Sequence, residues 1–237
     1  MDAIRPDPTF KVWDLPVRLL HWLLVAAIAV AFLSAEDDSP LSALHVAAGW
    51  MAAVLVAFRL AWGLVGGEHA RFTAFVRPAK ALAHLRHLAT GRAERSVGHN
   101  PAGGLAILLL IAGVAGVAAT GWLALQGGEG DLHEAFAWGL LGLVGVHVGA
   151  VIATSVLSGE NLARAMVTGR KRLADHPGAC TARSAGPVAL LFAVAVSGAV
   201  AVGIRALDPQ AFTAHPREAA TGQAGHGERD GGDGDQD

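Results

Sequence analysis

Four of the eleven histidines in this 237-residue chain lie inside or at the edge of long apolar segments: His21, His45, His133 and His147. An imidazole can bind a transition metal, relay a proton or form a hydrogen bond between helices. Because an ionisable side chain inside a membrane is costly, it is usually retained for a function. These four positions are therefore the first candidates for the chemistry of this protein.

The elements that must hold these histidines are membrane helices. The chain is 53% hydrophobic and 16% charged, which is too apolar for an ordinary soluble domain of this length. A spanning helix needs about 20 apolar residues, and the sequence predicts spans near residues 15–34, 44–65, 103–125, 135–157 and 187–204. We expect an all-α integral membrane bundle, with a four-helix core followed by a fifth, C-terminal transmembrane helix.

The connections between these spans alternate in charge. Lysine and arginine are abundant before the first span and in the connections over residues 66–100 and 158–186, whereas the connections over 35–43 and 126–132 carry only acidic charges. Cytoplasmic loops of membrane proteins are enriched in Lys and Arg. The pattern predicts a multi-pass protein with its N-terminus in the cytoplasm and its C-terminal tail in the periplasm.

Three segments lie outside the expected four-helix core. Leucines recur at helical spacing beside basic residues over 79–90, which predicts a helix that either lies on the membrane surface or is solvated. Residues 173–207 are interpreted as a linker with the extra span, and residues 208–237 as an acidic disordered tail. We interpret the histidines of the first and the last of these segments as solvated residues: His84, His87, His215 and His226.

The fourth span presents two histidines on nearly the same face. His133 and His147 are fourteen residues apart, which corresponds to roughly 21 Å along a helix axis and a rotation within about 40° of one face. With the expected topology, His45 lies at the outer depth of His133, and His21 lies at the cytoplasmic depth of His147. Helix spacing and loop charge therefore predict two pairs, His45 with His133 and His21 with His147.

A site made of two imidazoles fits haem better than a free metal ion. Zinc or nickel would be under-coordinated without a nearby Asp, Glu or Cys, whereas haem supplies four ring nitrogens and requires two axial ligands. The single cysteine, Cys180, and the lack of a CxxCH sequence exclude a covalently attached c-type haem. We expect two non-covalent b-type haems whose iron is bound by the four histidines. We expect Arg18 and Arg59 to bind the propionates of the cytoplasmic haem. Ser42, backbone groups or water are the expected partners of the propionates of the outer haem.

Six stretches of the chain carry a family resemblance: VWDLPVRLLHW, LHVAAGW followed by FRLAWGLVG, ARFTAFVRP, GHNPAGG and LHEAFAWGLLGLVGVHV. Together, over roughly residues 12–172, they resemble the prokaryotic cytochrome b561 and nickel-hydrogenase cytochrome b subunit family. The resemblance implies a cytochrome b561-type domain over residues 1–172 in a bacterial inner membrane. By motif position the four histidines carry over as axial ligands. His69 and His99 do not, and we interpret His99, in GHNP, as a turn or interface residue.

The resemblance also implies a function in a respiratory chain. A di-haem cytochrome b would transfer electrons between a quinone pool and a redox partner, such as a periplasmic cytochrome c or a hydrogenase. It would be a relay more than a bond-making enzyme, with quinone-linked oxidoreductase activity left open. The alternative is a transporter or channel whose histidines pass protons or bind a metal, and a cofactor-free assembly subunit is a third class. The basic residues lack the aromatic interleaving of a nucleic-acid site, so membrane lipid is the expected environment.

Overall fold

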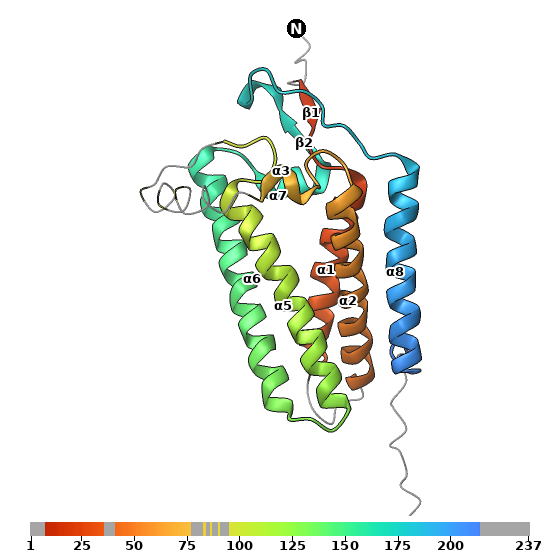
Figure 1. Ribbon diagram of the computed structural model, residues 1–237. Helices are drawn as coiled ribbons and strands as arrows, with labels where there is room; N and C mark the ends of the chain where they lie inside the picture. The colour runs from red at the N-terminus through yellow and green to blue at the C-terminus, as the bar shows by residue number, and fades with distance from the viewer. Residues whose placement is uncertain are drawn as a thin grey trace, which may run out of the picture.

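The computed structural model describes residues 8–35, 41–76, 83, 86, 90 and 95–213. Five long helices run alongside one another (Figure 1): α1 (Leu15–Leu33), α2 (Ser42–Val65), α5 (Pro101–Leu125), α6 (Gly130–Ser158) and α8 (Pro187–Leu207). Each is long and apolar enough to cross a membrane. The predicted all-α bundle with five spans is confirmed. Most of the predicted helix over 79–90, and the tail from residue 214 onward, lie outside the described residues.

Local signals in the sequence set the ends of these helices. Asp14 precedes α1, and its Oδ1 accepts a hydrogen bond from the backbone N–H of Val17 at 3.0 Å. Asn100 caps α5 in the same way, accepting from the N–H of Gly103 at 2.6 Å. Such side chains satisfy backbone donors that have no partner in the first helical turn. Helix α6 ends at Gly159, whose φ of 71° is a left-handed conformation that favours glycine.

A small cap covers one end of the bundle, and the sequence did not indicate it. Strand β1 (Thr9–Lys11) pairs antiparallel with β2 (Arg170–Arg172), so that Phe10 lies opposite Lys171. The short helices α3 (Phe72–Phe75) and α7 (Leu162–Thr168) and a 3-10 turn (Leu173–Asp175) lie at the same end (Figure 1). We call this the capped end, where α1, α5 and α8 begin and α2 and α6 finish. The opposite end is the distal end.

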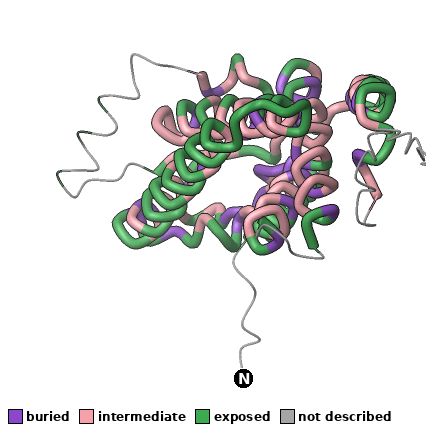
Figure 2. The backbone as a smooth tube through the Cα atoms, turned by 90° about the horizontal axis from the view of Figure 1, so that it is seen from below, coloured by how far each residue is buried: buried purple, intermediate pink, exposed green. Residues whose placement is uncertain are grey.

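The long helices pack as two pairs joined through their middle members. Helix α1 packs on α2 and α5 packs on α6, while α2 also contacts α5 and, on another side, α8. Seen from the distal end in Figure 2, much of the length of the helices is coloured as exposed, as expected of helices that face lipid. Midway along the bundle, small and branched side chains of four helices form a buried apolar layer: Ala27, Ala52, Val56, Val114 and Leu140.

Close contacts join the cap to the bundle. The second carboxylate oxygen of Asp14 accepts hydrogen bonds from the indole N–H of Trp62 at 3.1 Å and from the N–H of Gly67 at 3.3 Å. This links the first turn of α1 to the end of α2. The ring of Phe72 packs so closely on Gly63 that a Cβ there would overlap with its Cε2 atom. A larger residue at Gly63 would therefore displace α3 from α2.

The fifth helix is fixed to the core at its distal end. The indole N–H of Trp50, on α2, donates to Oδ2 of Asp208 at 3.0 Å, immediately after α8. Residues 208–213, the first part of the predicted disordered tail, form turns in which the N–H of Ala211 bonds to the carbonyl of Asp208 at 3.0 Å. The extra helix thus packs on the four-helix core instead of standing apart from it.

Candidate functional site

The structure brings His45 and His133 together at the distal end. Each lies in the first turn of its helix, α2 or α6, and their ring centroids are 5.9 Å apart with the planes at 88°. Nδ1 of His45 lies 2.7 Å from the carbonyl oxygen of Ala31 on α1. Nδ1 of His133 lies 3.1 Å from the carbonyl oxygen of Val117 on α5. All four core helices therefore contribute to this pair.

These carbonyl contacts fix which ring nitrogen carries the proton. A carbonyl oxygen only accepts, so Nδ1 of each imidazole must donate. A neutral imidazole then has its lone pair on Nε2, which is the arrangement found in metal-binding histidines oriented by a backbone carbonyl. The carbonyl of Ala31 is free to accept because it belongs to the last turn of α1, where main-chain oxygens have no partner within the helix.

A glycine on α5 makes room for one ring of the distal pair. A Cβ at Gly121 would lie 3.0 Å from Cε1 and 3.1 Å from Nδ1 of His133. Beside the other histidine, one turn further along α2, a Cβ on Gly49 would meet no atom within 4 Å. The first glycine allows a close contact, and the second faces open space. Of the two, only Gly121 constrains the position of an imidazole.

His21 and His147 face the same part of the bundle nearer the capped end. They lie on α1 and α6 within electrostatic range of each other. The ring of His21 packs edge-on against Trp22, with centroids 5.2 Å apart. Within the described part of the chain, neither imidazole has a hydrogen bond to a backbone carbonyl of the kind seen in the distal pair. The two pairs thus match in composition but differ in how their rings are held.

The two arginines expected at the cytoplasmic haem occupy different surroundings. Arg59 is buried on α2, 7% exposed, with its guanidinium 5.0 Å from the ring centroid of Phe72 and Nη1 3.3 Å from the carbonyl of Ala70. Arg18 instead donates to the carbonyl of Val167, beside the turn that follows α7. Arg59 therefore lies with the cap's aromatic residues, and Arg18 holds the end of α7 to α1.

His99 lies deeper than the sequence suggested. Its ring packs against Trp13, with centroids 4.4 Å apart, and against Phe75, with centroids 4.7 Å apart. Burial, and then the positive charge of Arg59, lower the pKa of His99 to about 3, and His147 is among its weaker electrostatic partners. The ring is therefore neutral at neutral pH. Motif position alone indicated a turn or interface residue, and only the folded cap reveals its proximity to His147.

His69 is a half-buried neighbour of this group. Burial lowers the pKa of His69, while the carboxylate of Glu68 acts in the opposite direction. A Cβ at Gly98 would lie 3.2 Å from Nδ1 of His69, so the ring packs on the segment that carries His99. Sequence reasoning excluded His69 as a ligand, and its position in the cap places it beside His99.

A buried ionic cluster holds the cap in place. Nζ of Lys171 lies 2.8 Å from Oε2 of Glu160, and Nε2 of His176 lies 2.6 Å from Oε1 of the same carboxylate. The lysine also donates to the carbonyl of Ser96 at 2.6 Å. Nearby, Nε of Arg95 donates to the carbonyl of Ser158 at 2.9 Å. These contacts join β2, the end of α6 and the segment that leads to α5.

Comparison with known proteins matches residues 12–169 to a family model described as prokaryotic cytochrome b561. Three similar curated proteins are each named "Probable Ni/Fe-hydrogenase B-type cytochrome subunit". The protein of Bradyrhizobium diazoefficiens is 24% identical, over 71% of this chain and 88% of its own length. That of Rhodobacter capsulatus is 23% identical, over 74% and 86%. That of Azotobacter vinelandii is 25% identical, over 73% and 93%. No solved structure matches significantly. The match to the family model spans well over half of the chain, which therefore belongs to the prokaryotic cytochrome b561 family.

Proposed function

We propose that this protein is a membrane-bound di-haem cytochrome b that relays electrons across the bundle. Membership in a family of b-type cytochromes implies haem b and electron transfer at a membrane. The number of haems and their ligands are the proposal. His45 and His133 would bind one haem iron at the distal end, and His21 and His147 would bind the other nearer the capped end.

The geometry of the distal pair carries this proposal. Two imidazoles that bind one metal ion through their Nε2 atoms, at about 2 Å each, would place their ring centroids roughly 6 Å apart. The observed separation is 5.9 Å. Both Nδ1 atoms are engaged by backbone carbonyls, so both Nε2 atoms remain as ligands. The residues present therefore fit a group that needs two axial imidazoles.

Bound haem supplies iron that is reversibly reduced by one electron, and the chain sets the conditions for that chemistry. Two imidazoles per iron would exclude other ligands, and at the distal pair the carbonyl contacts fix the ring orientation. The buried apolar layer around Leu140 lies between the two pairs, since this residue is seven positions from both His133 and His147. It excludes water from the space between the two sites.

The same layer argues against the transporter or channel alternative. A proton or metal path along the histidines would have to pass from one pair to the other. Between them, the described residues of the core form an apolar cluster that includes Val56, Val114 and Leu140. Such side chains offer no hydrogen-bonding groups to a proton or an ion. Electron transfer does not need such groups.

Haem content of the purified protein tests the proposal. We expect two non-covalent haems per chain and a reduced-minus-oxidised spectrum typical of b-type cytochromes. His133→Ala should remove the distal haem only, and His147→Ala the other only. A folded but colourless protein would overturn the proposal, and so would loss of both haems from a folded His133→Ala variant.

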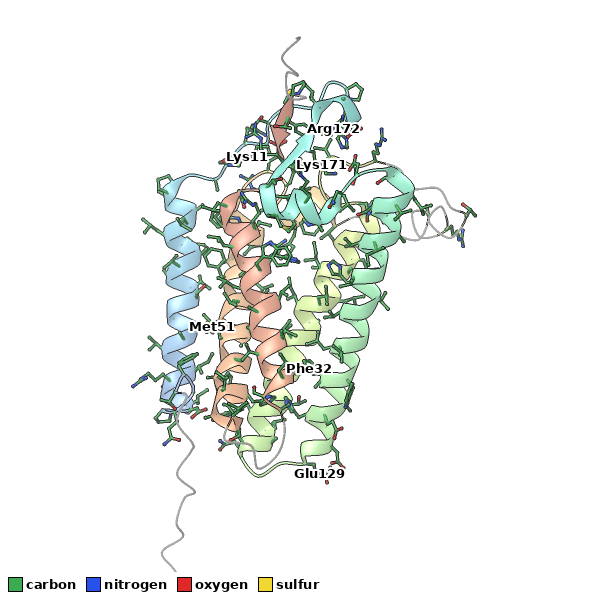
Figure 3. All side chains as sticks on the ribbon, turned by 180° about the vertical axis from the view of Figure 1, so that it is seen from behind. Lys11, Phe32, Met51, Glu129, Lys171 and Arg172 are labelled. Carbon is green, nitrogen blue, oxygen red and sulfur yellow. The ribbon has the colours of Figure 1, made fainter. Side chains whose placement is uncertain are left out.

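We also propose that the capped end faces the cytoplasm. The arginine and lysine residues of the cap support this orientation, since cytoplasmic loops are enriched in such residues. In Figure 3, Lys11, Lys171 and Arg172 lie at the capped end, whereas the acidic Glu129 lies at the distal end. The single cysteine, Cys180, is exposed in the segment before α8 and serves as a native probe. A membrane-impermeant maleimide should label it in inverted vesicles, and labelling in intact spheroplasts would contradict the orientation.

The names of the relatives support a partner class. Because the three proteins are named as Ni/Fe-hydrogenase cytochrome subunits, we propose a hydrogenase as electron donor and membrane quinone as acceptor. In native membranes under anaerobic conditions, hydrogen gas should reduce the haems, and added quinone should reoxidise them. Reduction by a reduced cytochrome c, with no response to hydrogen, would instead favour a periplasmic cytochrome as the partner.

A further inference from the structure

Arg59 is a buried cation that lacks an acidic partner. Its guanidinium has five N–H donors, yet the hydrogen bond found for it among the described residues is the one from Nη1 to the carbonyl of Ala70, at 3.3 Å. Asp14 is within electrostatic range, but its carboxylate already accepts from Val17, Trp62 and Gly67. A buried charge without a partner is costly. The position therefore calls for an anion.

His99 presents the same problem beside it. The backbone of His69 approaches the ring and acts to raise its pKa, but Nδ1 is buried and makes no hydrogen bond of good geometry within the part of the chain that the structure describes. Buried polar atoms without partners are rare in folded proteins, and each needs an explanation such as a bound ligand. The ring cannot turn freely to find a partner, because Trp13 and Phe75 pack against it.

These two groups lie together next to the capped-end histidines. Phe75 contacts both, with its centroid 5.8 Å from the guanidinium carbon of Arg59 and 4.7 Å from the centroid of the His99 ring. Arg59 lies six residues before the end of α2, and His21 lies six residues after the start of α1, so both have the same depth. His99 is also within electrostatic range of His147.

We propose that His99, together with Arg59, binds a carboxylate of the haem held by His21 and His147. A carboxylate accepts strong, charge-assisted hydrogen bonds and would neutralise the guanidinium. Among the described residues no acidic side chain pairs with Arg59, so the ligand itself would supply this group. His99 is then a cofactor-binding residue, and it anchors the edge of the haem where His21 and His147 hold its centre. This inference rests on the proposed function of the capped-end pair.

The test uses single-haem backgrounds so that each site is measured alone. In His133→Ala the remaining haem would be the capped-end one, and in His147→Ala the distal one. His99→Phe keeps an aromatic ring between Trp13 and Phe75 but removes both nitrogens. The readout is the rate at which haem passes from the protein to excess apomyoglobin, followed by absorbance.

In the His133→Ala background we expect His99→Phe to release haem about tenfold faster, because a charge-assisted hydrogen bond is lost. His99→Gln retains an amide N–H donor, so its rate of haem release should lie closer to that of the parent than to that of His99→Phe. If the phenylalanine variant does not fold, the glutamine variant is the one compared with the parent. In the His147→Ala background neither substitution should change release. His69→Phe, in the same cap and 6.4 Å from Trp13 by ring centroids, is the matched control and should have no effect.

Haem dimethyl ester separates a carboxylate contact from simple packing. Its propionates cannot act as anions, so parent and His99→Phe proteins reconstituted with it should release it at equal rates. Equal rates with ordinary haem, or a tenfold difference that persists with the ester, would overturn the inference and leave the axial ligands intact. If the two single-histidine backgrounds do not each keep one haem, the proposed function fails and the inference fails with it.

Discussion

The two ends of the bundle hold similar histidine pairs by different means. At the distal end, backbone carbonyls of α1 and α5 orient the rings of His45 and His133, and a glycine makes room for one of them. At the capped end, His21 and His147 have no such carbonyl contacts among the described residues, and His147 lies within electrostatic range of His99 in the cap. The distal site is therefore specified by helix geometry, and the capped site by tertiary contacts with buried charge.

This difference predicts that disruption of the cap affects one site only, and Glu160→Ala should have the largest such effect. The substitution leaves Lys171 and His176 buried without their acid, and losing one partner of a buried ion pair costs about 3–5 kcal/mol. Of the two haems that we propose, the one at the capped end should be lost at a lower temperature than the distal one, as measured by absorbance during heating. Glu129→Ala, at an exposed distal position, is the control. Simultaneous loss of both haems would show that the ends are not independent.

Leu140→Ala should instead affect both ends equally, with an intermediate cost. The side chain is 5% exposed and packs against α5, where a Cβ at Gly113 would lie 3.0 Å from its Cδ1 atom. Removing such a buried side chain costs about 2–5 kcal/mol in protein cores, and we expect about 2 kcal/mol in a membrane bundle. Both haems should dissociate faster by the same factor in the apomyoglobin assay. Leu141→Ala, at a position 38% exposed, should change neither rate.

Helix geometry also explains how much could be predicted from the sequence. Hydropathy located the first span as 15–34 and the second as 44–65, against observed helices Leu15–Leu33 and Ser42–Val65. The fourth was predicted from 135, but α6 begins at Gly130 because its polar first turn, with Asp131 and Glu134, is helical although it is not apolar. The spacing of fourteen residues indicated which histidines would share a depth, since α6 is continuous between them.

The cap was beyond the reach of such patterns. β1 and β2 have three residues each and are separated by most of the core, so neither alternation nor proximity along the chain indicates that they pair. The burial of His99 depends on Trp13 and Phe75, which come from two other segments. The glycine that makes room for a distal histidine, Gly121, also comes from another helix, α5, and not from the helix that carries His133. Contacts between distant segments, and not periodicity, decide these positions.

Gly121→Ala tests the distal site with a smaller change. The new Cβ would lie 3.0 Å from Cε1 of His133, so the ring must move by a few tenths of an ångström. We expect a changed electron paramagnetic resonance signal and a cost of about 1 kcal/mol for the distal haem, with the other haem unaltered. Gly142→Ala gains the same helix propensity but meets no atom within 4 Å, so it serves as the control. A change in the electron paramagnetic resonance signal of the capped-end haem would contradict the proposal that the two ends are independent.

The smallest effect on the stability of the cap is expected at Glu68, whose exposed carboxylate binds the segment before α8. Oε2 of this carboxylate accepts from the N–H of Arg183 at 3.0 Å, and that bond is the main reason that the pKa of Glu68 is lowered. The folded cap therefore favours the ionised form. The stabilisation is complete above the ordinary pKa of a glutamate and is lost as the pH falls through the lowered value.

A nitroxide on Cys180, three residues before Arg183, reports this contact. Its mobility should rise as the pH falls below the usual range of a glutamate, whereas Glu68→Gln should show a higher mobility that is independent of pH. Glu129→Gln should keep the pH response of the parent, because that residue lies at the other end of the bundle. Identical pH curves for the parent and Glu68→Gln would show that the cap does not depend on this charge. If acid raises the mobility of the nitroxide but leaves the distal haem spectrum unchanged, acid weakens only the capped end, where charged side chains hold the segments together.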